Sequence, residues 1–328
     1  MALDRSPTKQ QVTTDSGAVL DIWSDPSAGQ SLAQMFWRRV RERGDAEALR
    51  ESTADGWRAI SWAELGRRVR AIGLGLKSVG FGRHDVAAIV AGPGADWIAV
   101  EMAVYGVAGA VVAIDPKASP ETVNAIVADS GAKVAFVGDG VAGPSAGHVF
   151  AATDLDDLMA AGDVYDREHL GQWEQLVDLA RPKEAAALVY GPDGRGAMLS
   201  HKALVFQCVN ASRWLGMNAG DVRLAEAPMS DLAERVVGGH AALYAGVVIA
   251  YGGASDIEPT WHMPRLVCRP KGCGPVALLG DDGMVPAPYG ELRQDSDGGW
   301  ELRGEHAFSG YRDAPVPEGW LRLQGMTV

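Results

Sequence analysis

A short glycine-rich loop, residues 191 to 196, carries the residues with the clearest chemical potential. Arg195 supplies a positive charge that could attract a phosphate, whereas Asp193 would repel one. Pro192 has no backbone N–H to donate. A plain turn between a strand and a helix is therefore the favoured interpretation, and a degenerate phosphate-binding loop is the alternative. The loop residues concerned are Gly191, Asp193, Gly194, Arg195 and Gly196.

Two polar residues, Ser200 and His201, follow this loop where a helix is expected to begin. Serine is a preferred N-cap residue, because its hydroxyl accepts a hydrogen bond from an unpaired N–H of the first helical turn. A helix cap is therefore the favoured role of Ser200. In the alternative, both residues join Arg195 as groups that face a nucleotide.

An adjacent acid and base, Glu234 and Arg235, interrupt a predicted apolar helix. We expect them to form a structural ion pair or a solvated helix face, and substrate gating is the less favoured alternative. No Ser-His-Asp pattern and no convincing set of metal ligands accompanies them. Cys268 and Cys273, with His262 as the one further candidate, fall short of the four ligands of a structural zinc site.

Composition excludes several classes of protein. The chain of 328 residues has 22% charged residues and a net charge of −12, without an isolated basic block, which disfavours nucleic acid as a partner. No apolar run reaches the roughly 18 residues of a membrane span. The polar N-terminus has no apolar core of a signal peptide, so we expect a cytoplasmic protein.

Alternating strand and helix signals position the candidate residues. Ser31 with Gln34, and Ser61 with Glu64, are capping-box pairs that predict helix starts. The other signals predict an α/β fold with a parallel sheet covered by helices. Strands are expected at 86–91, 111–114, 133–137, 185–190, 222–227 and 247–251, and helices at 96–106, from 119, at 200–214 and at 232–244, with one or two more between 138 and 182.

Four segments follow from this pattern. They are a flexible arm at 1–29, a first α/β subdomain at 30–180, a second at 181–266, and a small antiparallel β unit at 267–328. The last segment is rich in Gly, Pro and Asp-Gly pairs between short apolar runs, as in β-hairpins.

Several segments, taken in order, resemble one known family. They include "GVAGAVVAIDP" (106–116), "SGAKVAFVGD" (130–139), "APMSDLAERVVGGHAALYAGVVIAYG" (227–252) and "YGELRQDSDGGWELRGEHAFSGYRDAP" (289–315). The chain is similar to long-chain fatty-acid–CoA ligases and their adenylate-forming relatives. The resemblance implies the layered parallel-sheet N-terminal domain of that family, followed by its small β unit. It also implies ATP-dependent joining of a carboxylate to AMP and then to a thiol such as coenzyme A.

The same resemblance marks losses. The loop at 191–196 looks like a shortened nucleotide loop without Ser or Thr, in which Arg195 matches the family's lysine. Met326 replaces the family's ribose-binding Asp, and Asp231 replaces a His that follows Ser230 in the acyl-site segment. No counterpart of the family's magnesium-binding motif occurs between residues 264 and 274, and the chain ends where the family's mobile C-terminal domain would begin. The acyl-site segment comprises Ser230, Asp231, Glu234 and Arg235.

These features favour a pseudoenzyme that serves as an interaction, scaffold or regulatory protein, either as a homo-oligomer or with a protein partner. On this hypothesis no cofactor is expected and no residue is assigned as catalytic. The first alternative is residual ligase activity, with ATP, magnesium and CoA, completed by a separate chain. The second is a non-catalytic sensor that binds an acyl-CoA or a nucleotide.

Overall fold

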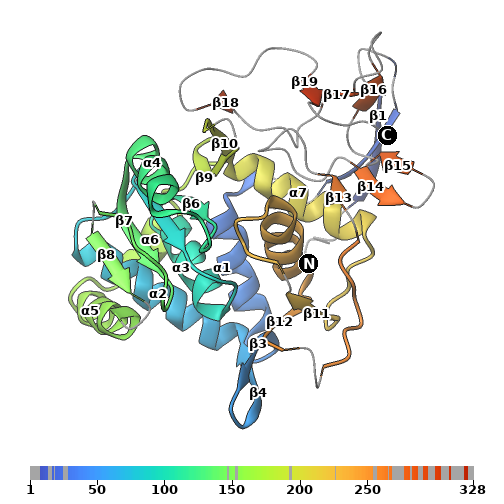
Figure 1. The fold of residues 1–328 in the computed structure, drawn as a ribbon. Coiled ribbons are helices and arrows are strands. Elements are labelled where there is room, and N and C mark those ends of the chain that lie inside the picture. The colour runs from blue at the N-terminus through green and yellow to red at the C-terminus, as the bar shows by residue number, and fades with distance from the viewer. Residues whose placement is uncertain are drawn as a thin grey trace.

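The computed structural model describes most of the chain, with helices and strands arranged as shown in Figure 1. The described residues are 8–13, 17, 19–24, 29–145, 148–151, 154–191, 194–225, 227–253, 257–264 and the short strands β13 to β19. Of the residues that the sequence singles out, Pro192, Asp193, Cys268, Cys273 and Met326 lie outside the described part of the chain.

A seven-stranded sheet forms the centre of the described structure, in the order β18-β10-β9-β6-β5-β7-β8. The strands from β9 to β8 run parallel, whereas β10 and β18 join antiparallel at one edge. This arrangement confirms the predicted α/β class. The strands are β5 (Val86–Val90), β6 (Ala110–Ile114), β7 (Ala132–Val137), β8 (His148–Ala151), β9 (Ala185–Tyr190), β10 (Gly196–Ser200) and β18 (Gly310–Tyr311).

Helices cover both faces of this sheet, because alternate side chains of each buried strand point to opposite faces. In β5, Ala88 and Val90 pack with α4 on one face, while Ala87 and Ile89 belong to the larger core with α2 and α3 (Figure 1). The helices are α1 (Leu32–Arg43), α2 (Trp62–Ser78), α3 (Ala95–Gly106), α4 (Pro120–Ser130), α5 (Leu155–Glu168), α6 (Gln172–Val177) and α7 (His201–Trp214).

A second sheet of four strands has the order β11-β12-β3-β4, with its first three strands parallel. Strands from both sides of residue 180 enter each sheet: β3 pairs with β12, and β6 pairs with β9. The two α/β segments expected at 30–180 and 181–266 are therefore interleaved in space. The strands are β3 (Glu47–Thr53), β4 (Gly56–Ser61), β11 (Val222–Ala225) and β12 (Val248–Tyr251).

Local capping signals predicted the helix starts well. Ser31 forms a complete capping box with Gln34, and Gly44 ends the same helix. Ser61 and Ser119 likewise accept hydrogen bonds from N–H groups of their own first turns. These signals are legible in sequence because donor and acceptor lie within three residues of each other.

Three elements differ from the sequence-based expectations. The arm at 1–29 contains an antiparallel hairpin, β1 (Thr8–Thr13) with β2 (Val19–Ser24), where a loosely ordered segment was expected. Residues 196–200, between the expected turn at 191–196 and the expected helix from 200, form the strand β10. The helix expected at 232–244 is mostly a π-helix, η3 (Glu234–Ala241), followed by the short α8 (Ala242–Ala245).

The C-terminal strands pair antiparallel, as predicted for residues 267–328. They form the sets β13-β14-β15 and β16-β17-β19, while β18 leaves this region to join the large sheet. Their bounds are β13 (Leu266–Val267), β14 (Ala277–Gly280), β15 (Gly283–Pro286), β16 (Glu291–Gln294), β17 (Trp300–Arg303) and β19 (Leu321–Leu323). In the part of the chain that the structure describes, no helix has the length and apolar character required to cross a membrane.

The contact between α2 and α5 yields a stability prediction. A Cβ added to Gly162 would lie 1.9 Å from the carbonyl oxygen of Ala71, which is backbone and cannot rotate away. We expect Gly162→Ala to lower the free energy of unfolding by about 1–3 kcal/mol through overpacking. The matched control is Gly92→Ala, where the added Cβ meets nothing within 4 Å. Urea denaturation of both variants measures the difference, and equal stabilities would contradict the close approach.

Candidate functional site

The loop at 191–196, interpreted from the sequence as a plain turn or alternatively as a degenerate nucleotide loop, connects the antiparallel strands β9 and β10. The N–H of Gly194 donates to the carbonyl of Gly191 at 3.0 Å, and Gly194 has the positive φ of 71° that glycine tolerates. The turn therefore uses one of the N–H groups that a phosphate would need. Arg195 is exposed beside it. Gly196 lies so close to the ring of Tyr190 that an added Cβ would be 2.8 Å from the ring carbon Cζ.

The start of α7 has its own donors paired within the protein. The N–H groups of His201 and Lys202 donate to the carbonyls of Glu184 and Pro182, at 3.1 and 2.6 Å. The N–H of Ala203 donates to the hydroxyl of Ser200 at 3.2 Å, which confirms Ser200 as the N-cap. A helix N-terminus binds anions through these first N–H groups. Here all three already have protein partners.

His201 faces the protein core. Its Nδ1 accepts a hydrogen bond from the N–H of Leu32 at 3.3 Å, and its ring meets the ring of Tyr105 edge-on. The side chain is buried, and this burial lowers the pKa of His201 to about 4. The imidazole is therefore neutral near pH 7 and connects the first turn of α1 to the first turn of α7.

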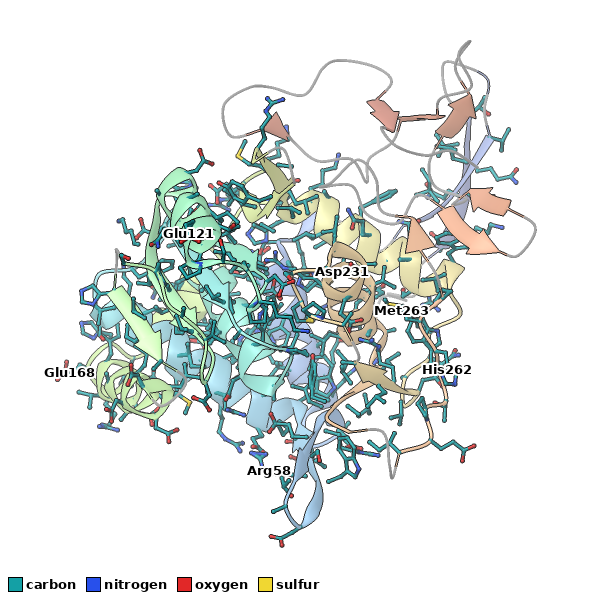
Figure 2. The ribbon with its side chains drawn as sticks, viewed as in Figure 1. Arg58, Glu121, Glu168, Asp231, His262 and Met263 are labelled. Carbon is teal, nitrogen blue, oxygen red and sulfur yellow. The ribbon has the colours of Figure 1, made fainter. Side chains whose placement is uncertain are left out.

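The acyl-site segment leads into η3. The Oδ1 atom of Asp231 accepts a hydrogen bond from the N–H of Glu234 at 2.9 Å, and Ser230 is half-buried next to it. Asp231 itself is exposed, near the middle of the view in Figure 2. The carboxylate of Asp231 thus caps a helical segment, a role for which aspartate is well suited.

Glu234 and Arg235 are neither paired with each other nor solvated. Glu234 binds the guanidinium of Arg223 through two hydrogen bonds of 2.7 and 3.0 Å, and both side chains are almost fully buried. The same guanidinium donates to the carbonyl of Gly238 at 2.8 Å. The predicted solvated face is therefore wrong, and the predicted ion pair has a different partner.

Arg235 enters a second buried cluster. Its Nε donates to Oε1 of Glu101 at 2.7 Å, and Nε2 of His240 lies 2.8 Å from Oε2 of the same carboxylate. The hydroxyl of Tyr105 donates to Oε1 of Glu101 at 2.8 Å and accepts from Nη2 of Arg235 at 3.0 Å. Glu101 thus has three partners in an interior where an unpaired charge would be strongly destabilising.

The charge state of this cluster follows from its contacts. Burial on its own would raise the pKa of Glu101, but the positive charges and hydrogen bonds of His240 and Arg235 outweigh it and lower the pKa to about 2. Burial raises the pKa of Tyr105 well above its usual value. The carboxylate is therefore ionised and the phenol is neutral near pH 7, which suits a structural ion pair.

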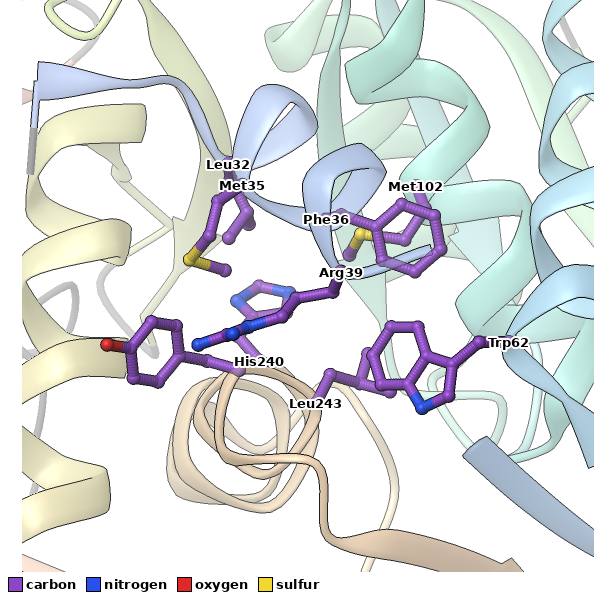
Figure 3. Close-up of a pocket in the computed structure, with 9 residues that line it drawn as sticks. Leu32, Met35, Phe36, Arg39, Trp62, Met102, His240 and Leu243 are labelled. Carbon is purple, nitrogen blue, oxygen red and sulfur yellow. The ribbon is translucent and has the colours of Figure 1, made fainter. Parts of the chain in front are cut away.

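The space beside this cluster is small. Side chains of α1, α3 and the η3–α8 segment, with Trp62, enclose a cavity of about 10 Å³ (Figure 3). That volume holds about one water molecule, whereas small-molecule sites have volumes of roughly 300–1,000 Å³. The lining residues are Leu32, Met35, Phe36, Arg39, Trp62, Met102, His240, Leu243 and Tyr244.

Sequence reasoning missed the partners that make these clusters: Glu101, Tyr105, Arg223 and His240. One signal was available, because Glu101 is a lone acid within the otherwise apolar run of α3. Such an acid requires a buried cationic partner.

Among the described residues, no group of three or more His, Cys, Asp or Glu side chains could hold a metal ion. Cys208 is buried, and burial raises the pKa of its thiol, so it is unreactive.

The family model of AMP-binding enzymes matches residues 36–264. The chain belongs to the AMP-binding enzyme family. Long-chain-fatty-acid–CoA ligase ACSBG1 of Macaca fascicularis is 22% identical in an alignment 311 residues long that covers 80% of this chain and 42% of that protein. Malpibaldin synthetase of Mortierella alpina is 30% identical in an alignment 190 residues long that covers 56% of this chain and 3% of that protein. The chain therefore spans less than half the length of these curated relatives.

Solved structures of the family share the fold. VinN in complex with L-aspartate superposes with a TM-score of 0.69 at 16% identity, covering 91% of this chain and 97% of that chain. The N-terminal domain of FACL13 from Mycobacterium tuberculosis gives 0.66 at 14% identity, with coverages of 89% and 95%. These neighbours confirm the layered architecture of an adenylate-forming domain.

The neutral, buried His201 predicts a pH dependence of stability. Its pKa is lower in the folded state, about 4, than the roughly 6.5 of an unfolded chain, so the unfolded state binds more protons between these values. Stability is fully present above pH 6.5 and falls as the pH drops toward 4. We expect His201→Gln to remove about 2 kcal/mol of the loss between pH 6.5 and pH 5. Urea titrations at several pH values test this, with the exposed His262→Gln as the control that keeps the wild-type profile.

The buried pair of Arg223 and Glu234 yields a second prediction. Arg223→Met leaves the Glu234 carboxylate buried without a cationic partner, so we expect a loss of about 3–5 kcal/mol in the free energy of unfolding. The control is Arg58→Met, which removes the partner of Glu64 at a partly exposed site, with an expected loss of less than about 1 kcal/mol. Urea denaturation measures both losses, and a small effect at Arg223 would show that the pair is not essential to the fold.

Proposed function

We propose that this protein is an acyl-CoA synthetase-like scaffold with a defective nucleotide site, acting in the cytoplasm as an interaction or regulatory protein. The proposal rests on one observation: the backbone N–H groups that would have to bind a phosphate are already hydrogen-bonded within the protein. The N–H groups of Gly194, His201, Lys202 and Ala203 all have partners inside the protein. A phosphate gains little from donors that are already paired, because binding would require each existing hydrogen bond to break.

The residues present do not fit ATP with magnesium at this loop. Arg195 offers a positive charge, but the donors around it are committed to a hairpin and a helix start. The acyl-site segment adds Asp231, a carboxylate that would repel a carboxylate substrate. Behind that segment, buried ion pairs and a cavity of about 10 Å³ occupy the interior. On this proposal the chain carries out no adenylation step.

A partner completes the proposal. A scaffold acts by binding another molecule, so we propose that the protein forms a homo-oligomer or binds a protein partner. Light scattering coupled to size-exclusion chromatography tests the first form, and affinity capture from the source cell tests the second. A strict monomer that captures nothing would contradict this part of the proposal.

The second candidate function is residual carboxylate adenylation, completed by a separate chain, and the exposed Arg195 at the family's nucleotide loop favours it. The curated relatives include a fatty-acid–CoA ligase and peptide synthetases, so the shared substrate class is a carboxylic acid. A third candidate binds an acyl-CoA or nucleotide without turnover. Saturable binding without product formation would distinguish it from both others.

The decisive experiment is calorimetric titration with Mg-ATP up to the millimolar range, with folding verified by circular dichroism. We expect no saturable heat. The nonribosomal peptide synthetase FmoA3, which has been solved with AMPPNP bound, is the positive control. Saturable binding that Arg195→Gln abolishes would favour the second candidate, and acyl-AMP formed from a panel of fatty acids would overturn the scaffold proposal.

A further inference from the structure

One carboxylate holds two side chains of the same helical segment. Glu101 on α3 accepts a hydrogen bond from Arg235 through Oε1 at 2.7 Å and contacts Nε2 of His240 through Oε2 at 2.8 Å. Arg235 and His240 are five residues apart, and η3 (Glu234–Ala241) contains both. All three side chains are buried.

The spacing of five is incompatible with an α-helix. At 3.6 residues per turn, positions i and i+5 lie roughly 140° apart around the axis, so their side chains point to different faces. A π-helix has i→i+5 hydrogen bonds, which bring such residues one above the other. Both side chains can therefore reach one carboxylate only while the segment keeps its wider turn.

We propose that Glu101 is a positioning residue: it selects the π-helical register of η3 and thereby sets the orientation of Ser230 and Asp231. The proposal is independent of whether the protein retains any catalytic activity. A return to the α-helical register would shift the residues on one side of the segment by one position relative to those on the other side. The acyl-site residues upstream would then rotate by roughly 100° relative to α8 downstream.

The surroundings hold Glu101 in place as the fixed partner. Tyr105, on the same helix, bonds to both Glu101 and Arg235, and the ring of Trp97 lies 5.5 Å from the Arg235 guanidinium. The ring of His201 on α7 packs against Tyr105 in turn. The moving element is therefore the segment at 230–241.

A second set of contacts also holds η3: the guanidinium of Arg223 binds Glu234 and the carbonyl of Gly238. This contact could hold the π register without Glu101. Removing the Glu101 contacts and removing the Arg223 contacts in separate variants shows which of the two sets holds the π-helical register.

The test is a set of crystal structures of full-chain variants. In Glu101→Gln, we expect residues 234–241 to adopt the α-helical register, with Ser230 and Asp231 rotated. Because that variant leaves Arg235 without a carboxylate, a second variant combines Glu101→Met, Arg235→Met and His240→Leu, so that no unpaired charge is buried. We expect the same change of register there.

The control removes the second set of contacts through Arg223→Met combined with Glu234→Met, and we expect the π register to persist. The π register surviving in the Glu101 variants, or disappearing in this control, would overturn the proposal.

Deletion of Gly239 adds a measurement in solution. It places Arg235 and His240 four residues apart, where an α-helix brings both to Glu101. We expect a melting temperature within about 5 °C of wild type, and a larger fall would contradict the geometry.

Discussion

The buried carboxylate of Glu101 is the constraint around which the described structure is organised. It lies on the largely apolar helix α3, and its three partners come from its own helix and from η3. An unpaired charge in this interior would be strongly destabilising, so α3 and η3 have to meet in one arrangement. Tyr105 extends that arrangement to His201, and His201 extends it to the first turn of α1. Four helices are thus placed relative to one another by hydrogen bonds and one edge-on ring contact within an otherwise apolar core.

The pairing of backbone donors also underlies the proposed loss of nucleotide binding. A phosphate-binding loop needs N–H groups that point into open space until the ligand arrives, which lowers the stability of the protein without its ligand. Here the N–H group of Gly194 and the first three N–H groups of α7 are paired with acceptors of the protein itself. The architecture of the AMP-binding family persists because strand order and core packing do not depend on those few donors.

Features encoded within a few neighbouring residues were predictable from the sequence. The caps at Ser31 and Ser200 and the buried strand β5 follow from short patterns, and so did the class of the fold. What the sequence concealed depends on residues far apart along the chain. The partner of Arg235 lies 134 residues away, and our proposal assigns the wide turn of η3 to that distant Glu101. The strand β10 was not predicted, because its five residues follow a glycine-rich turn and carry no strand signal of their own. Its pairing with β9 and β18 is what makes it a strand. Ser200, Glu234 and Arg235 were singled out from the sequence, but the distant partners of Glu234 and Arg235 could not be predicted from it.

Each sheet takes strands from both sides of residue 180, so neither sheet can be completed early in synthesis. The strand β3 leaves the ribosome about 200 residues before β12, the strand beside which it lies in the finished sheet. Until then its open edge has backbone groups without a strand partner, which is a state prone to wrong pairing. Cutting the chain near residue 180 would leave two fragments that each lack strands of both sheets. The fold is therefore completed late, by closure of contacts between distant segments, and such closure is intrinsically slow.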